Sequence, residues 1–170
     1  MTGSSGIKRV TPDNWLRIDP AWSGIYMPHE SGDGSAEWVE YVMNVTMNAS
    51  VPEHVRTLFA TAQGAITYSL LFYPLMAMGC DQIMRIIETA ARAKCTLMGA
   101  PSLRKFSRVI EWLTENQVIV GKEAAERWRL IRELRNDASH PRFQSLYNVA
   151  MMKDHLIIGS MAINELFPLQ

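Results

Sequence analysis

Apolar residues recur at three- and four-residue steps between residues 50 and 166, the spacing that places them on one face of an α-helix. The spacing predicts five helices, over residues 50–71, 74–98, 102–115, 122–140 and 144–166. Prolines and glycines mark the breaks between them. Pro74 suits the first position of the second helix, and Gly99 and Pro101 end that helix. Because the residue before a proline avoids the helical conformation, Pro141 ends the fourth helix at His140.

Serines stand at two of the predicted helix starts. Ser50 and Ser102 are expected N-caps, with Pro52 in the first turn and Glu53 complementing the helix dipole. The inward faces are expected to contain Ile83, Ile86, Ile87, Ala90, Ala91, Leu103, Phe106, Val109, Ile110, Leu113, Ala124, Ala125, Trp128, Ile131, Leu134, Ala138, Leu146, Val149, Leu156, Ile157, Met161 and Ile163. Five such helices joined by short connections predict an all-α antiparallel bundle over residues 50–170.

Residues 1–49 form a separate N-terminal arm, expected to be irregular or to contain a short β-hairpin. Gly, Ser, Pro and Asp are frequent there, and residues 31–35 are typical of a turn. Apolar and polar residues alternate over residues 39–47, with Val42 as the one exception, which predicts a strand paired with residues near Ile25. The aromatic rings of the arm are expected to pack it onto the bundle rather than to stack on bases; they are Trp15, Trp22, Trp38 and Tyr41.

Length and composition fit one domain of 170 residues, 48% apolar and 20% charged. Lys+Arg and Asp+Glu both number 17, which argues against a polycationic DNA-binding protein. The longest apolar run, residues 65–79, is shorter than the ~20 residues that a membrane-spanning helix needs, and Pro74 interrupts it. No signal peptide opens the chain, and Cys80 and Cys95 are the only cysteines. We therefore expect a soluble cytoplasmic protein that does not bind membranes.

The neutral total conceals an uneven distribution of charge. Residues 1–53 carry three basic and seven acidic side chains, whereas residues 85–108 carry six basic side chains and one acid, Glu88. Residues 122–142 carry six basic and four acidic side chains. The basic middle of the chain either faces a phosphate backbone or forms solvated helix faces.

The common catalytic and metal-binding signatures are absent from the sequence. It contains no G-x-G-x-x-G, Walker, H-E-x-x-H or G-x-S-x-G motif and no C-x-x-C pair, so we expect neither a cofactor nor a metal. His29 and His54 are isolated and are expected to be surface or capping residues, and His155 is expected to be a surface or packing residue.

Residues 134–141 hold a different combination of side chains. Asn136 and His140 share a helix face, and the long side chain of Arg135 can reach the same edge. An imidazole can exchange a proton with a ribose 2′-hydroxyl or a departing 5′-oxygen, and a guanidinium can hold the phosphate. This chemistry suits RNA cleavage without a metal. The alternative is structural: His140 caps the helix and Arg135 pairs with an acid.

Arg135, Asn136 and His140 resemble the signature of the HEPN superfamily (higher eukaryotes and prokaryotes nucleotide-binding), an Arg followed at a short interval by His near the end of a long helix. Arg85 and Glu88 resemble the Arg-x-x-Glu stretch of an uncharacterised bacterial HEPN-like branch. The resemblance covers roughly residues 50–167. It implies that the Glu88 helix packs against the motif helix, where Glu88 either pairs with Arg135 or orients His140.

The resemblance implies a metal-independent endoribonuclease, of the kind found in toxin–antitoxin and phage-defence systems, that acts as a homodimer. Arg135, Asn136, His140 and Glu88 are its expected catalytic residues. The residues expected to guide RNA are Arg85, Arg92, Lys94, Arg104, Lys105, Arg108, Arg132 and Arg142. The alternative is a non-catalytic module that binds RNA or a nucleotide, or that assembles with an antitoxin or another protein through its N-terminal arm.

Overall fold

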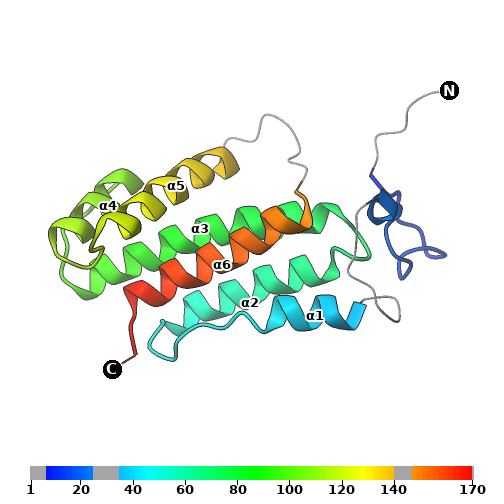
Figure 1. The fold of residues 1–170 in the computed structure, drawn as a ribbon, viewed down its shortest axis with the longest axis horizontal. Helices are drawn as coiled ribbons and strands as arrows, with labels where there is room; N and C mark the ends of the chain where they lie inside the picture. Colours follow the sequence, from blue (N-terminus) through cyan, green and yellow to red (C-terminus); the bar gives the residue numbers. More distant parts are fainter. Residues whose placement is uncertain (1–6, 25–34, 140–146, 170) are drawn as a thin grey trace.

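The computed structural model describes residues 7–24, 35–139 and 147–169, and this part of the chain contains helices and no strand (Figure 1). A 3-10 turn, η1, spans Pro20–Gly24. The α-helices are α1 (Ser35–Met43), α2 (Glu53–Tyr68), α3 (Pro74–Leu97), α4 (Phe106–Glu115), α5 (Lys122–Ser139) and α6 (Val149–Leu166). The predicted all-α bundle is confirmed, with one helix more than expected. None of the described helices combines the length and the apolar character needed to cross a membrane.

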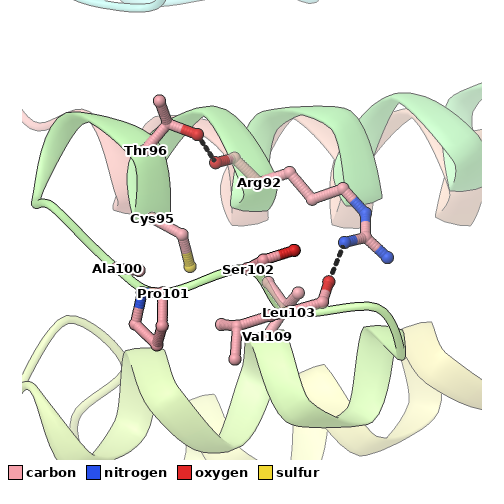
Figure 2. Close-up of a pocket in the computed structure, with 8 residues that line it drawn as sticks. All are labelled: Arg92, Cys95, Thr96, Ala100, Pro101, Ser102, Leu103 and Val109. Atoms are coloured by element: carbon pink, nitrogen blue, oxygen red, sulfur yellow. Dashed lines mark hydrogen bonds between the residues drawn. The ribbon is translucent and has the colours of Figure 1, made fainter.

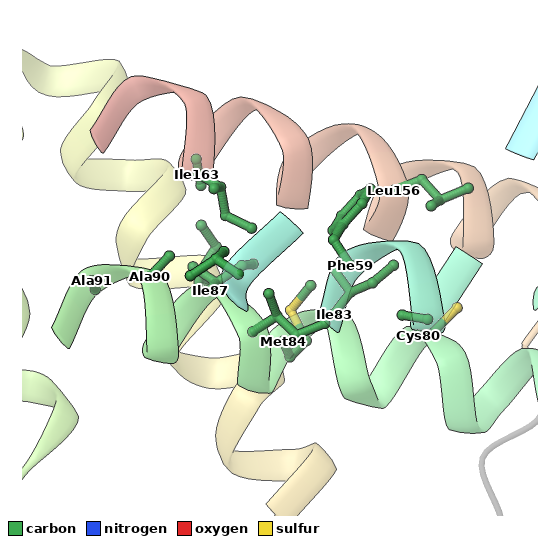
Figure 3. Close-up of a cluster of buried hydrophobic side chains, with 14 of the residues drawn as sticks. Phe59, Cys80, Ile83, Met84, Ile87, Ala90, Ala91, Leu156 and Ile163 are labelled. Atoms are coloured by element: carbon green, nitrogen blue, oxygen red, sulfur yellow. The ribbon is translucent and has the colours of Figure 1, made fainter. Parts of the chain in front are cut away.

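Helix α3 is the centre of the bundle. It packs against α2 and α6, and also against α4 and α5, which Figure 1 shows on the opposite side. Figure 3 shows Ile83 of α3 toward Phe59 of α2, and Ile87 of α3 toward Ile163 of α6; all four side chains are at most 1% exposed. Burial of such a side chain contributes about 1.5–3 kcal/mol, so these contacts hold α3 in place.

Glycine allows α2 and α3 to approach closely. A Cβ at Gly79 would lie 2.5 Å from Cγ1 of Ile66 and 2.9 Å from the backbone oxygen of Ala62. Both distances are far below van der Waals contact, and one of the atoms is backbone, which cannot rotate away. The long contact between α2 and α3 therefore requires Gly79.

The predicted helix limits are right for α3 but not for two of its neighbours. Pro74 begins α3 as its first residue, as expected. The expected caps Ser50 and Ser102 are wrong, because α2 has Pro52 at its N-cap and α4 begins only after Lys105. The Ser50 hydroxyl instead donates to the Phe167 backbone oxygen at 2.6 Å.

The predicted β-hairpin is wrong, because residues 35–43 form helix α1. Its buried pair is Trp38 and Val42, four residues apart, which is helical spacing. The alternating residues Val39 and Met43 are exposed, and Gln63 donates to the Val42 backbone oxygen at 2.6 Å. Val42, which interrupts the alternation, is therefore the residue whose position indicates a helix instead of a strand. The expected pairing partner near Ile25 lies outside the described residues.

Two tryptophans hold the arm against the bundle, as predicted. The Trp22 indole N–H donates to the Ser69 backbone oxygen at 2.8 Å, and Trp22 meets Trp38 edge to face with ring centroids 5.2 Å apart. Tyr41 is half-buried, and its ring lies 4.4 Å from Nζ of Lys153. For Trp15 the prediction is wrong, because its side chain is 56% exposed.

Three of the residues expected to face inward are exposed: Ala125, Ile157 and Met161. Ala125 and Ile157 directly follow the buried residues Ala124 and Leu156, and one residue turns a helix by about 100°. Ala138 and Leu146 lie outside the residues whose side chains are described. The two cysteines are buried and free, and burial raises the pKa of Cys80 to about 12.

Candidate functional site

Helix α5 carries Arg135 on the edge of its buried face. Trp128 and Ile131 are fully buried on that face, and Arg135 follows Ile131 by four residues and Trp128 by seven, which is helical spacing. The Arg135 guanidinium lies 5.9 Å from the centre of the Phe106 ring at the start of α4. Packing of α5 against α3 and α4 therefore fixes where Arg135 lies.

Glu88 of α3 joins Arg135 to a second arginine. Its side chain is only 13% exposed; Oε2 lies 2.5 Å from Nε of Arg135, and Oε1 lies 2.7 Å from Nη2 of Arg92. Glu88 pairs with Arg135, which is one of the two roles expected for it; the other role involves His140, which lies outside the described residues. One carboxylate thus orients two cations, one on α3 and one on α5.

Arg92 in turn holds the chain between α3 and α4. Its guanidinium donates to the backbone oxygens of Leu103 at 2.5 Å and Arg104 at 3.0 Å, as well as to Glu88. These bonds hold residues 103 and 104 outside the helix, and the extended backbone of Lys105 follows them, so α4 begins later than Ser102. Glu88, Arg92 and Arg135, which we call the Glu88 network, therefore link α5 to the α3–α4 connection.

A hollow of about 280 Å³ lies beside this network, between α5 and the start of α4; we call it the basic pocket. It is lined by Arg104, Lys105, Phe106, Ser107, Arg132, Arg135 and Asn136. Four of these seven residues are cationic, and none of the described residues that line the pocket is a carboxylate. Arg132 and Asn136 follow one another by one helical turn, and Arg135 Nη1 lies 3.4 Å from the Asn136 side-chain oxygen.

Three of the four cations in the basic pocket have no acidic partner among the described residues: Arg104, Lys105 and Arg132. All three residues are exposed. The start of α4 opens into the same pocket, and its N-cap, Lys105, makes no side-chain capping bond. The first N–H groups of a helix lack intrahelical partners and favour anions, so they add to the positive potential.

A second hollow of about 280 Å³ lies on the other side of the α3–α4 connection; we call it the side cleft (Figure 2). It is lined by Arg92, Cys95, Thr96, Ala100, Pro101, Ser102, Leu103 and Val109. Cys95 and Val109 are buried at its base, and burial raises the pKa of the Cys95 thiol against the opposing charge of Arg92. Leu103 lines the side cleft and the next residue, Arg104, lines the basic pocket, so the two hollows adjoin.

Other residues expected to bind substrate lie away from both hollows. Arg108 is exposed and pairs with Glu111 at 2.7 Å, and Nζ of Lys94 lies 5.5 Å from the centre of the Phe167 ring. Arg85 is exposed on α3, one turn before Glu88. The two remaining predicted site residues, His140 and Arg142, lie outside the described part of the chain.

The sequence did not indicate a polar cluster around Tyr147, just before α6. The Tyr147 hydroxyl donates to Asp81 at 2.9 Å, and its ring meets His155 edge to face at 5.0 Å. Burial raises the pKa of Tyr147, and the bond to Asp81 raises it further. His155 is buried, which fits the expected packing role, and Nδ1 lies 2.7 Å from the Met151 backbone oxygen.

Ser107 and the start of α4 were also not expected at the site. The misplaced helix start hid them, because a cap at Ser102 would place residues 105–107 inside the helix. Among the residues that the structure describes, no group of three or more His, Cys, Asp or Glu side chains is placed to hold a metal ion.

Comparison with protein-family models, with curated proteins and with solved structures finds no match to this chain.

Proposed function

We propose that this protein binds RNA in the basic pocket and cleaves it as a metal-independent endoribonuclease of the HEPN type. The observation that carries the proposal is the lining of the pocket: four cations, an amide and a helix N-terminus around one hollow, with no carboxylate among them. Guanidinium groups and helix N-termini are the groups with which proteins hold phosphates.

Arg135 is the best placed of these cations to act on a reacting phosphate. Glu88 fixes Nε, while Nη1 lies 3.4 Å from the Asn136 side-chain oxygen and the residue lines the basic pocket. A preoriented cation stabilises the charge that develops on the phosphate in the transition state, because it does not have to reorganise during the reaction.

His140 completes the proposed chemistry, on the strength of its place in the sequence four residues after Asn136. As a base it takes the proton from a ribose 2′-hydroxyl, and the 2′-oxygen then forms a bond to phosphorus. The bond from phosphorus to the 5′-oxygen breaks, and that oxygen takes up a proton. The products are a 2′,3′-cyclic phosphate and a 5′-hydroxyl.

A cleavage assay in EDTA tests this proposal. The purified protein is expected to cut RNA without added metal, to leave intact an RNA with 2′-deoxy nucleotides, and to lose activity on His140→Ala or Arg135→Ala substitution. A matched control is His54→Ala, an exposed histidine at the start of α2. Cleavage that survives His140→Ala would remove the assignment of His140.

The alternative is a non-catalytic RNA- or nucleotide-binding module. The tight contact between Arg135 and Glu88 favours it, because the same pair also ties α5 to α3 as a structural element. Under this alternative the protein binds RNA with the same pocket residues but leaves it uncut in every buffer. The two candidates therefore differ in the cleavage assay and agree in a binding assay.

A homodimer is part of the first candidate, as is a role in a toxin–antitoxin or phage-defence system. Exposed apolar side chains on α1 and α6 support an interface between copies: Val39, Met43, Ile157 and Met161. Light scattering tests it directly, with a mass of twice 19.3 kDa expected. Ile157→Asp is expected to return the protein to a monomer.

A further inference from the structure

We propose that the side cleft binds a base of the RNA whose phosphate occupies the basic pocket, and so gives the protein a preference at one nucleotide position. The inference rests on the proposed binding of RNA. In this proposal the basic pocket binds a phosphate of the RNA, and the side cleft is a second subsite that binds a base.

The side cleft lacks the features of a phosphate site. Its one cation is Arg92, and four of the five N–H groups of that guanidinium already donate, two to Glu88 and one each to the Leu103 and Arg104 backbone oxygens. The charge of Arg92 is therefore balanced by Glu88. An anion is better served by the unpaired cations of the basic pocket.

The lining of the side cleft suits a flat heterocycle instead. Cys95 and Val109 form a buried apolar base, and the neutral thiol of Cys95 adds no charge there. Ser102 supplies a hydroxyl group from the α3–α4 connection, and Thr96 lies on the α3 side, where its hydroxyl donates to the Arg92 backbone oxygen at 3.0 Å and keeps its capacity to accept (Figure 2). A nucleobase has apolar faces and an edge of hydrogen-bonding groups, and proteins that recognise single-stranded RNA hold unstacked bases in this way.

The position of the side cleft links it to the phosphate site. Leu103 lines the side cleft and the next residue, Arg104, lines the basic pocket, and consecutive Cα atoms are about 3.8 Å apart. Arg92 binds the backbone oxygens of both residues, so their positions are fixed. A base and a neighbouring phosphate of one short RNA can therefore occupy the two sites together.

The test measures the affinity of the full chain for a short 2′-O-methyl RNA, which cannot be cleaved, by fluorescence anisotropy. In a series of RNAs, each nucleotide in turn lacks its base. Base contacts in such proteins commonly change affinity by about tenfold or more, so one position in the series is expected to show a loss of that size. If every abasic RNA binds like the parent RNA, the base subsite is refuted while the proposed RNA binding stands.

Two variants locate the effect in the side cleft. Thr96→Trp covers the cleft from α3, and Ser102→Trp covers it from the α3–α4 connection; both residues are exposed, which favours folding of the variants. Each is expected to bind the parent RNA about tenfold more weakly and the sensitive abasic RNA as the wild type does. If both variants keep full affinity for the parent RNA, the base is bound elsewhere and the proposal is wrong.

Thr89→Trp is the matched control. Thr89 lies on α3 seven residues before Thr96, its hydroxyl makes the same bond to a backbone oxygen one turn earlier, and it lines neither hollow. It is expected to leave the affinity for all the RNAs unchanged. If the wild-type protein binds none of them, the proposed function itself fails.

Discussion

Neutralising Glu88 is expected to destabilise the protein, because one carboxylate holds two arginines from two different helices. Glu88→Gln keeps the size of the side chain and removes its charge. Both ion pairs are then lost, those with Arg92 at 2.7 Å and with Arg135 at 2.5 Å. The two guanidinium groups also stay close to each other with no carboxylate between them.

The size of the effect follows from the hydrogen bonds and from exposure to solvent. A hydrogen bond to a charged group contributes about 1.5–3 kcal/mol to stability, and a bond between neutral groups contributes about 0.5–1.5 kcal/mol. Replacing the carboxylate by an amide is therefore expected to weaken its interaction with each arginine by about 1 kcal/mol. The Arg92 side chain is 37% exposed, and screening by water reduces its share. We expect Glu88→Gln to lower the free energy of unfolding by about 1–2 kcal/mol. For a protein of this size that lowers the Tm by about 2–8 °C.

Urea unfolding followed by circular dichroism measures this difference, with Glu111→Gln as the matched control. Glu111 also pairs with an arginine on its own helix at 2.7 Å, but the two side chains are 70% and 50% exposed. An exposed pair of this kind contributes at most about 1 kcal/mol, and we expect a loss within about 0.5. If Glu88→Gln costs no more than Glu111→Gln, the Glu88 network does not hold α5 to α3.

Three further predictions concern the bundle. Gly79→Ala is expected to lower the free energy of unfolding by about 1–3 kcal/mol, because the added Cβ would collide with α2. Gly64→Ala is expected to raise the free energy of unfolding by up to about 1 kcal/mol, because no atom lies within 4 Å of its Cβ and alanine favours a helix. Equal effects of the two substitutions in urea unfolding would contradict the packing of α2 on α3. Tyr147 has a raised pKa in the folded protein, so its contribution to stability is complete below about pH 10 and is lost as the pH rises through that raised pKa. Unfolding at about pH 9 and about pH 11 is expected to show a smaller alkaline loss of stability for Tyr147→Phe than for the wild type, and an equal loss in both proteins would refute a raised pKa of Tyr147. Cys80 is fully buried with a pKa raised to about 12, so mass spectrometry is expected to find it unmodified by iodoacetamide in native buffer, and rapid alkylation would contradict its burial.

Helical periodicity predicted the bundle well where burial is strong. The stripe of α3 that contains Ile83 and Ile87 lies in contact with helices on both sides, so its apolar spacing is complete. The starts of α2 and α4 were missed because tertiary contacts decide them. Ser50 binds the Phe167 backbone oxygen instead of capping a helix, and Arg92 binds the backbone oxygens of Leu103 and Arg104, which precede α4.

The N-terminal arm was misjudged for a related reason. Residues 39–47 alternate in polarity, yet residues 35–43 form a helix, because this places Trp38 and Val42 on one face where both are buried. Alternation over a short stretch is compatible with a helix when only two of its residues reach the core. The spacing of those two residues, one helical turn apart, was the signal that distinguishes the two structures.

The sequence indicated much of the candidate site, since Arg135, Asn136 and Glu88 lie together with three of the predicted basic residues. It did not separate Arg104 and Lys105 from Lys94 and Arg108, which belong to the same basic run. Position along the chain does not tell which side of α3 and α4 a cation occupies. The packing of the helices determines that Arg104 and Lys105 line the pocket and that Lys94 and Arg108 lie away from it.

The most direct test of the basic pocket is the salt dependence of RNA affinity for Arg132→Ala and Arg129→Ala. Both residues are exposed on α5, but Arg132 lines the pocket without an acidic partner among the described residues, and Arg129 pairs with Glu133 away from it. Each phosphate contact with a single strand contributes about 0.7 to the slope of log affinity against log salt. We predict weaker binding and a slope shallower by about 0.7 for Arg132→Ala, with Arg129→Ala like the wild type. Equal affinity and equal slope for all three proteins would show that the pocket does not bind RNA.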